Sequence, residues 1–180
     1  MLSFAVSPST VGNYGAASRI VQASQVTLWA FNRIMYPKLV AGAADGHRTL
    51  LELAYQQAFV MTALGGVTSV GLYIISPYAA AAFGPGFVDM ADYLKILCWI
   101  VLLVGIQSVA FDALAALERH ALRASIANIC SVVGVGLVAG LTFSFGMTGT
   151  FVAIFATLTV SLASMWIALL QVTNCLPFKT

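Results

Sequence analysis

The sequence predicts an all-α integral membrane protein, a polytopic bundle of about five transmembrane helices. Of its 180 residues, 61% are hydrophobic and only 8% are charged, and the mean hydropathy is +0.96. Soluble domains carry about 25% charged residues, and a single core of this size cannot bury so much apolar surface. Long continuous apolar runs favour helices over the alternating strands of a membrane barrel.

Short polar breaks divide residues 1–180, a single transmembrane domain, into five apolar segments, each near the length of about 20 residues that spans a bilayer. The first helix is expected to end at Pro37 and the second at Ser76-Pro77, because proline interrupts helical hydrogen bonding. A tight turn, Gly146-Met-Thr-Gly149, separates the last two segments. The expected helices cover 14–40, 53–75, 93–117, 125–145 and 150–171.

Basic residues near the helix ends predict the orientation of the chain. The loops 41–52 and 118–124 lie on the same side as the C-terminal tail and carry most of the cations. Because cytoplasmic loops are enriched in lysine and arginine, both loops are predicted to be cytoplasmic. The net charge of +2 is too small to indicate a nucleic-acid partner. The basic residues on this side are Lys38, Arg48, Arg119, Arg123 and Lys179.

Polar side chains gather on one face of the first helix. At about 100° per residue, the polar positions between Ser18 and Tyr36, except Ser24 and Thr27, fall within an arc of about 140°. An arginine near the bilayer centre costs at least about 2.5 kcal/mol, so such a stripe is tolerated only beside a protein interior or a water-filled cavity. The candidate substrate-cavity residues are Arg19, Gln22, Gln25, Trp29, Asn32 and Arg33.

Another interpretation places both arginines near helix ends, where their long side chains reach the headgroups. That interpretation accounts for Arg19 and Arg33. It does not account for Gln22, Gln25 and Asn32, whose side chains are too short to reach water from mid-helix.

Polar residues on the other helices have simpler interpretations. Gln56 and Gln57 begin the second helix, where a solvated helix end and a function explain them equally well. Asp112 is expected to pair with Arg119 or Arg123, and ion coupling at Asp112 is the alternative. Asn128 is expected to make a hydrogen bond between helices.

Small residues on the fourth segment predict close helix packing. Gly136 and Gly140 form a GxxxG pattern, with Gly134 alongside. Such spacing lets helix backbones approach one another, and it carries no information about a substrate.

Motifs of catalysis and metal binding are absent from the sequence. There is no GxSxG, HExxH or Walker A motif and no cluster of carboxylates. Cys98, Cys130 and Cys175 are scattered through apolar stretches without metal-ligand spacing. We therefore predict that the chain is not an enzyme and needs neither a metal nor a cofactor.

Several short segments resemble a known transporter family. The first begins Leu2-Ser-Phe and continues through Val11-Gly-Asn-Tyr-Gly-Ala-Ala-Ser-Arg-Ile20 to Pro37. The others are Ala82-Phe-Gly-Pro-Gly-Phe87 and Phe145-Gly-Met-Thr-Gly-Thr-Phe-Val-Ala153. Together they resemble polysaccharide flippases, the O-antigen and exopolysaccharide exporters of the multidrug/oligosaccharidyl-lipid/polysaccharide exporter superfamily. The resemblance covers nearly the whole chain in order, through short motifs.

The resemblance implies a twelve-helix transporter with two lobes around a central cavity in the bacterial cytoplasmic membrane. Such transporters move lipid-linked oligosaccharides to the outer leaflet. This chain would supply the last five helices of the second lobe, with Met1–Ser9 ending a preceding helix. The partners implied are the lipid-linked substrate, membrane lipids and an N-terminal lobe from the same or a separate chain. The family's polar cavity lining would correspond to Arg19, Gln22, Gln25, Asn32 and Arg33.

Three other functions remain open at this point. Two are transporters of the same superfamily, a drug/cation antiporter and a peptidoglycan-precursor flippase. A cation-coupled drug exporter would be favoured by an acidic residue deep in the first or second helix, and neither helix has one. The third is a non-transporting membrane subunit, which would not need the polar stripe.

Overall fold

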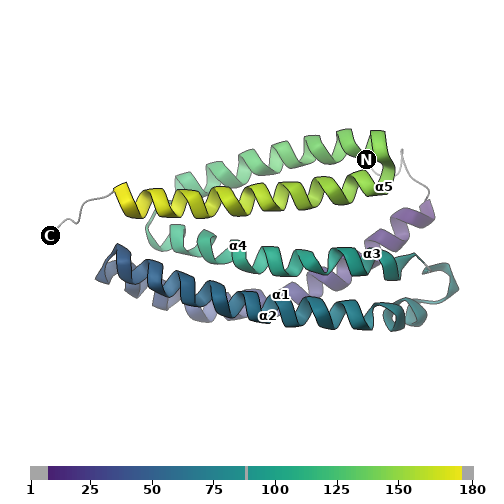
Figure 1. Ribbon diagram of the computed structural model, residues 1–180, viewed down its shortest axis with the longest axis horizontal. Coiled ribbons are helices and arrows are strands. Elements are labelled where there is room, and N and C mark those ends of the chain that lie inside the picture. The colour runs from purple at the N-terminus through teal and green to yellow at the C-terminus, as the bar shows by residue number, and fades with distance from the viewer. Residues whose placement is uncertain (1–7, 88, 176–180) are drawn as a thin grey trace.

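The computed structural model describes residues 8–87 and 89–175, which form helices with no strand among them (Figure 1). The predicted all-α class is confirmed. Residues 1–7, assigned by the resemblance to a preceding helix, lie outside the described part, whereas Pro8 and Ser9 begin the first helix. The elements are α1 Pro8–Asp45, α2 His47–Phe83, the 3₁₀ helix η2 Pro85–Phe87, α3 Met90–Leu97, α4 Trp99–Ala116 and α5 His120–Cys175.

Three stretches of the described chain are long and apolar enough to cross a membrane: α2, Met90–Ala116 (α3 with α4), and His120–Asn174 within α5. The helix α1 is not among them, and its stripe of Gln, Asn and Arg side chains lowers its hydropathy. Large apolar side chains cover the outside; Phe59 is 78% exposed and Phe143 is 76% exposed. Lipid is the solvent that suits such a surface, so the chain is built as a membrane-embedded bundle. The count of about five spans stays a prediction.

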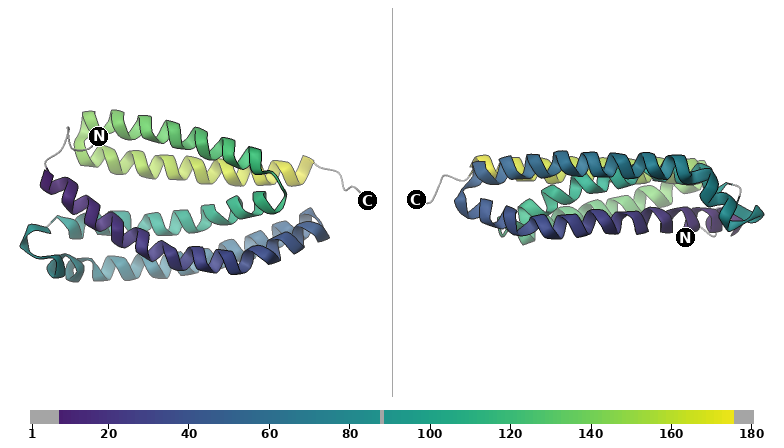
Figure 2. Two further views of the ribbon diagram at one scale, coloured as in Figure 1. Left: turned by 180° about the vertical axis from the view of Figure 1, so that it is seen from behind. Right: turned by 90° about the horizontal axis from the view of Figure 1, so that it is seen from below.

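The helix α5 is bent back on itself at Gly146, whose φ of 60° and ψ of −139° are not helical. This backbone conformation favours glycine, which has no Cβ to clash with the neighbouring carbonyl. Residues 120–145 form a first arm and residues 147–175 a second arm, and the two arms lie side by side (Figures 1 and 2). The break predicted at Gly146–Gly149 is therefore confirmed.

The predicted helix ends at the two prolines are wrong. Pro37 lies inside α1 and Pro77 lies inside α2. A proline removes one backbone hydrogen bond, whereas ending the helix there would leave several polar groups unpaired in apolar surroundings. The chain turns instead at Gly46 and Gly84, with φ of 135° and 99°.

The bundle has two layers with α4 between them. Seen from below, α1 and the first arm of α5 lie on one side, and α2 and the second arm lie on the other (Figure 2). The helix α4 packs against α1, α2 and α5, and Gln107 of α4 donates a 2.7 Å hydrogen bond to Ser161 of the second arm. The core between these helices includes Leu28, Leu50, Met61, Leu94, Val109 and Met165.

Close helix approach depends on other glycines than the predicted pair. A Cβ at Gly134 would lie 2.6 Å from Thr157 Cγ2, and one at Gly149 would lie 2.1 Å from the Leu141 carbonyl oxygen. Gly136 and Gly140 face open space. Only the expectation for Gly134 is confirmed, because the two arms meet along a line that leaves Gly136 and Gly140 on the outer surface.

Candidate functional site

The six predicted cavity residues all lie on α1, but the structure divides them into two groups. Gln25 and Asn32, seven residues apart and hence on one line of the helix, are buried at 8% and 4% exposure. The other four are exposed: Arg19, Gln22, Trp29 and Arg33. The arc predicted from periodicity therefore straddles the boundary between the packed side of α1 and its open side.

Asn32 lies at the centre of a buried polar network that joins three helices. Its Oδ1 accepts a 2.9 Å hydrogen bond from Gln57 Nε2 of α2. Its Nδ2 donates to Ser108 Oγ of α4, and Ser108 in turn donates to the Gly105 carbonyl at 2.7 Å. This network fixes α1 against α2 and α4 in apolar surroundings, where unpaired polar groups are costly.

Sequence reasoning did not place Gln57 in the core. It is 2% exposed, so its interpretation as part of a solvated helix end is wrong. The signal was available, because Leu50, Ala54, Gln57 and Met61 follow the three- and four-residue spacing of one buried helix face. The expectation for Asn128 is also wrong. Its side chain is exposed on the first arm of α5, so it does not lie between helices.

The contacts of α1 show which of its sides remain open. Leu28 faces α4, where a Cβ on Gly105 would lie 2.9 Å from its Cδ2. Further along α1, Gly42 faces α2, where Leu53 Cδ1 would lie 2.4 Å from an added Cβ. The packed side of α1 therefore turns from the α4 contact toward α2.

The exposed polar residues lie on the opposite flank. A helix turns by about 100° per residue. Around its axis, Gln22, Trp29 and Arg33 therefore lie about 100–140° from Leu28, on the side of Leu28 that is farther from Gly42. The first arm of α5 lies in the same layer as α1, beyond α4 (Figure 2). Near the α5 bend, α1 also meets the second arm, where the rings of Tyr14 and Phe151 are 6.2 Å apart.

Neither arginine on this flank has a carboxylate partner in the described part of the chain. The ion pairs found there are Arg48–Glu52 at 3.2 Å and Lys95–Asp92 at 2.9 Å, each within one helix and at the surface. The positive charge of Arg19 and Arg33 is therefore available to an anion that comes from outside these helices.

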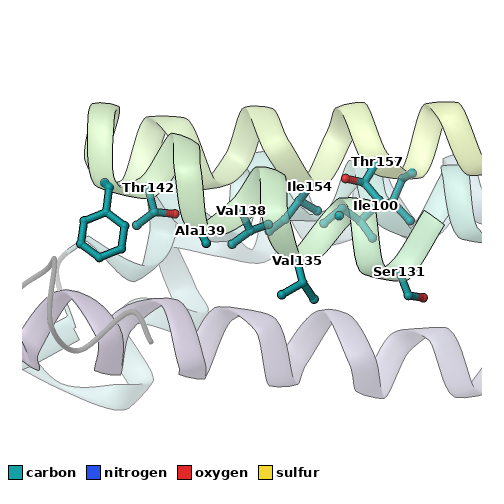
Figure 3. A pocket seen from close by; sticks show the side chains of 11 residues that line it. Ile100, Ser131, Val135, Val138, Ala139, Thr142, Ile154 and Thr157 are labelled. Atoms are coloured by element: carbon teal, nitrogen blue, oxygen red, sulfur yellow. The ribbon is translucent and has the colours of Figure 1, made fainter. Parts of the chain in front are cut away.

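An apolar cavity of about 670 Å³ lies between α4 and the two arms of α5 (Figure 3). Val135 and Ser131 are directed toward the side on which the α1 ribbon passes (Figure 3). An apolar cavity and a cationic flank suit the two ends of an amphipathic anion. The cavity is lined mainly by aliphatic side chains, among them Ile100, Val135, Val138, Ile154 and Leu158.

Asp112 lies on α4 and is half-buried. The expected ion pair with Arg119 or Arg123 is not among those of the described residues. The Arg123 guanidinium instead lies 4.1 Å from the centroid of the Phe111 ring, a cation–π contact. Ion coupling at Asp112 stays a prediction.

The described residues contain no group of three histidine, cysteine or acidic side chains placed to hold a metal ion. Cys98 and Cys130 are free thiols. No protein-family model, curated protein or solved structure matches the chain.

Proposed function

We propose that this chain is the C-terminal, five-span part of a bacterial flippase that moves lipid-linked oligosaccharide across the cytoplasmic membrane for surface polysaccharide synthesis. The observation that carries the proposal is the exposed flank of α1 with Arg19, Gln22, Trp29 and Arg33. Lipid would not tolerate the amide and guanidinium groups of this flank along the middle of a spanning helix. A polar pathway through the protein would accommodate these groups.

Each group on the flank suits one part of such a substrate. The guanidinium groups of Arg19 and Arg33 can each form two parallel hydrogen bonds to pyrophosphate oxygens. Trp29 offers an aromatic face and an N–H donor to a sugar ring, and Gln22 offers an amide. Asn32, bonded to Gln57 and Ser108, holds the flank in position.

The open side of α1 also gives a place for the rest of the transporter. We place an N-terminal lobe, from the same or a separate chain, across the polar flank, so that the cavity forms between the lobes. The five spans are α1, α2, α3 with α4, and the two arms of α5. The turns at Gly46 and at residues 117–119, within the predicted loops 41–52 and 118–124, face the cytoplasm, in agreement with the basic residues around them.

Replacing Arg19 and Arg33 together by glutamine is expected to lower polysaccharide export by about tenfold or more, since each charge-assisted hydrogen bond contributes about 1.5–3 kcal/mol. Export is measured as surface polysaccharide in cells that depend on this chain. Protein in the membrane fraction is quantified in parallel.

Arg48→Gln is the matched control, because it removes one positive charge outside the flank, from the surface pair with Glu52. Its export should equal that of the unaltered chain. Normal export by the Arg19→Gln/Arg33→Gln variant at equal protein level would refute the proposed function.

A further inference from the structure

The apolar cavity of about 670 Å³ lies between three helical segments, α4 and the two arms of α5 (Figure 3). Ile100 of α4 lines it on one side, and the first arm lines it from Ser131 to Phe143. The second arm contributes side chains between Ile154 and Leu158. An engineered apolar cavity of about 150 Å³ already binds benzene, and this one is more than four times as large.

Contacts around the cavity prevent the three segments from closing on it. The two arms already touch beside it, since a Cβ on Gly134 would lie 2.6 Å from a side-chain atom of the second arm. The helix α4 is held on the second arm by the 2.7 Å hydrogen bond from Gln107 to Ser161. At the end away from the bend, α4 meets the first arm where the Arg123 guanidinium lies over the Phe111 ring. The space between α4 and the first arm is therefore a fixed feature of the packing.

The lining of the cavity selects an apolar occupant. Two of its hydroxyls are bonded within the protein: Thr142 shares a 2.7 Å hydrogen bond with Thr150, and Thr157 donates to the Ala153 carbonyl at 2.7 Å. None of the described residues that line the cavity is charged or carries an amide. Apolar cavities stay dry, because water finds no hydrogen-bond partners in them. The occupant that suits this lining is a hydrocarbon.

The depth of the cavity indicates which hydrocarbon reaches it. It lies between Met90–Ala116 and His120–Asn174, two stretches that are long and apolar enough to cross a membrane. Phe143 is three residues from the bend, and Ser131 is twelve residues further, about 18 Å along the helix. One leaflet contributes about 15 Å to the hydrocarbon layer. The cavity therefore extends over the depth of one leaflet, which is the reach of one fatty acyl chain.

Another helix fits the cavity poorly. A helix about 10 Å wide would need about 1,400 Å³ along the same length, about twice the volume of the cavity. A neighbouring helix can cover the mouth of the cavity, but it does not fill the space inside.

We infer that the cavity holds one fatty acyl chain of a phospholipid from the leaflet on the side of the α5 bend. The chain fills space that the side chains of the three segments leave, and it gains dispersion contacts that the flat outer surface does not offer. Its headgroup stays at the membrane surface, so the site selects the chain and not the headgroup. The inference does not depend on the proposed transport function.

The test is the number of phospholipid molecules that the purified full chain retains in detergent, measured by native mass spectrometry. We expect one dipalmitoyl phosphatidylcholine to be retained, and dihexanoyl phosphatidylcholine, whose chains are too short to fill the cavity, to be lost. Dipalmitoyl phosphatidylglycerol should bind as well as the choline lipid, because the lining carries no charge. A preference for one headgroup, or equal retention of the short and long chains, would overturn the inference.

A tryptophan inside the cavity competes with the chain for the same space. Val138 is half-buried and lines the cavity, and Val138→Trp should lower the affinity for the retained lipid about tenfold or more. Val132→Trp is the matched control, because Val132 is 74% exposed on the same arm and does not line the cavity. Its lipid retention should equal that of the unaltered chain.

Two further measurements keep the inference testable. If Val138→Trp does not fold, Ile100→Trp fills the cavity from α4 and should have the same effect. Equal retention by a folded cavity variant and by Val132→Trp would place the lipid on the outer surface and refute the site. A polyprenyl phosphate is offered as a competitor, and its displacing the phospholipid at lower concentration would show that the cavity is built for a branched chain instead.

Discussion

Replacing Gly149 by alanine is expected to lower the free energy of unfolding by about 3 kcal/mol. The new Cβ would lie 2.1 Å from the carbonyl oxygen and 2.6 Å from the carbonyl carbon of Leu141. Both atoms are backbone, so no side chain can rotate away, and the two arms of α5 must separate to relieve the contact. The measurement is thermal unfolding of the purified protein in detergent.

Gly140→Ala is the control within the same helix. A Cβ at Gly140 meets nothing within 4 Å, and alanine in an open helical position stabilises by about 0.5–1 kcal/mol. The two substitutions add the same methyl group and should shift the unfolding temperature in opposite directions. A similar shift for both would show that the arms do not approach at Gly149.

Replacing Asn32 by leucine is expected to cost about 2 kcal/mol of stability. The substitution removes the acceptor of Gln57 Nε2 and the donor to Ser108 Oγ. Gln57, whose Oε1 is already unpaired, would then have no hydrogen bond for its buried amide. Loss of stability is measured as denaturant or thermal unfolding in the same detergent.

The same change at Asn128 controls for the loss of an asparagine, since Asn128 is exposed on α5. Asn128→Leu should change stability by less than about 0.5 kcal/mol. In a double-mutant cycle, Asn32→Leu with Gln57→Leu should cost less than the sum of the single changes, because both partners of one bond are removed. Additive losses would contradict the network.

Much of the fold could be predicted from the composition and from the turn-forming residues between the apolar segments. The long apolar runs predicted helices in a membrane, and Gly146 in its turn-rich context predicted the break where α5 bends. The predicted helix ends at the prolines were wrong, because a helix in apolar surroundings loses fewer hydrogen bonds by continuing through Pro37 or Pro77 than by ending there. The ends of α1 and α2 instead fall beside Gly46 and Gly84, which have positive φ. The local sequence does not predict which glycine adopts this conformation.

The candidate site was predictable in part. Helical periodicity alone placed Arg19, Gln22, Trp29 and Arg33 on one face of α1, and the structure agrees that they share an exposed flank. Periodicity also assigned Asn32 to that face, yet Asn32 is buried against Gln57 and Ser108. Which polar residues of α1 are buried and which are exposed depends on where α4 packs on α1.

By itself, the sequence determined that this protein is a helical membrane bundle with a polar stripe on its first long helix. Only the tertiary structure decided which edge of the stripe is buried, that Gln57 is buried and bonded to Asn32, and that Gly149 rather than Gly140 permits close packing. The physical reason is that residue spacing specifies which side chains share a face of a helix. The neighbour that a face meets depends on how helices distant in sequence pack against it.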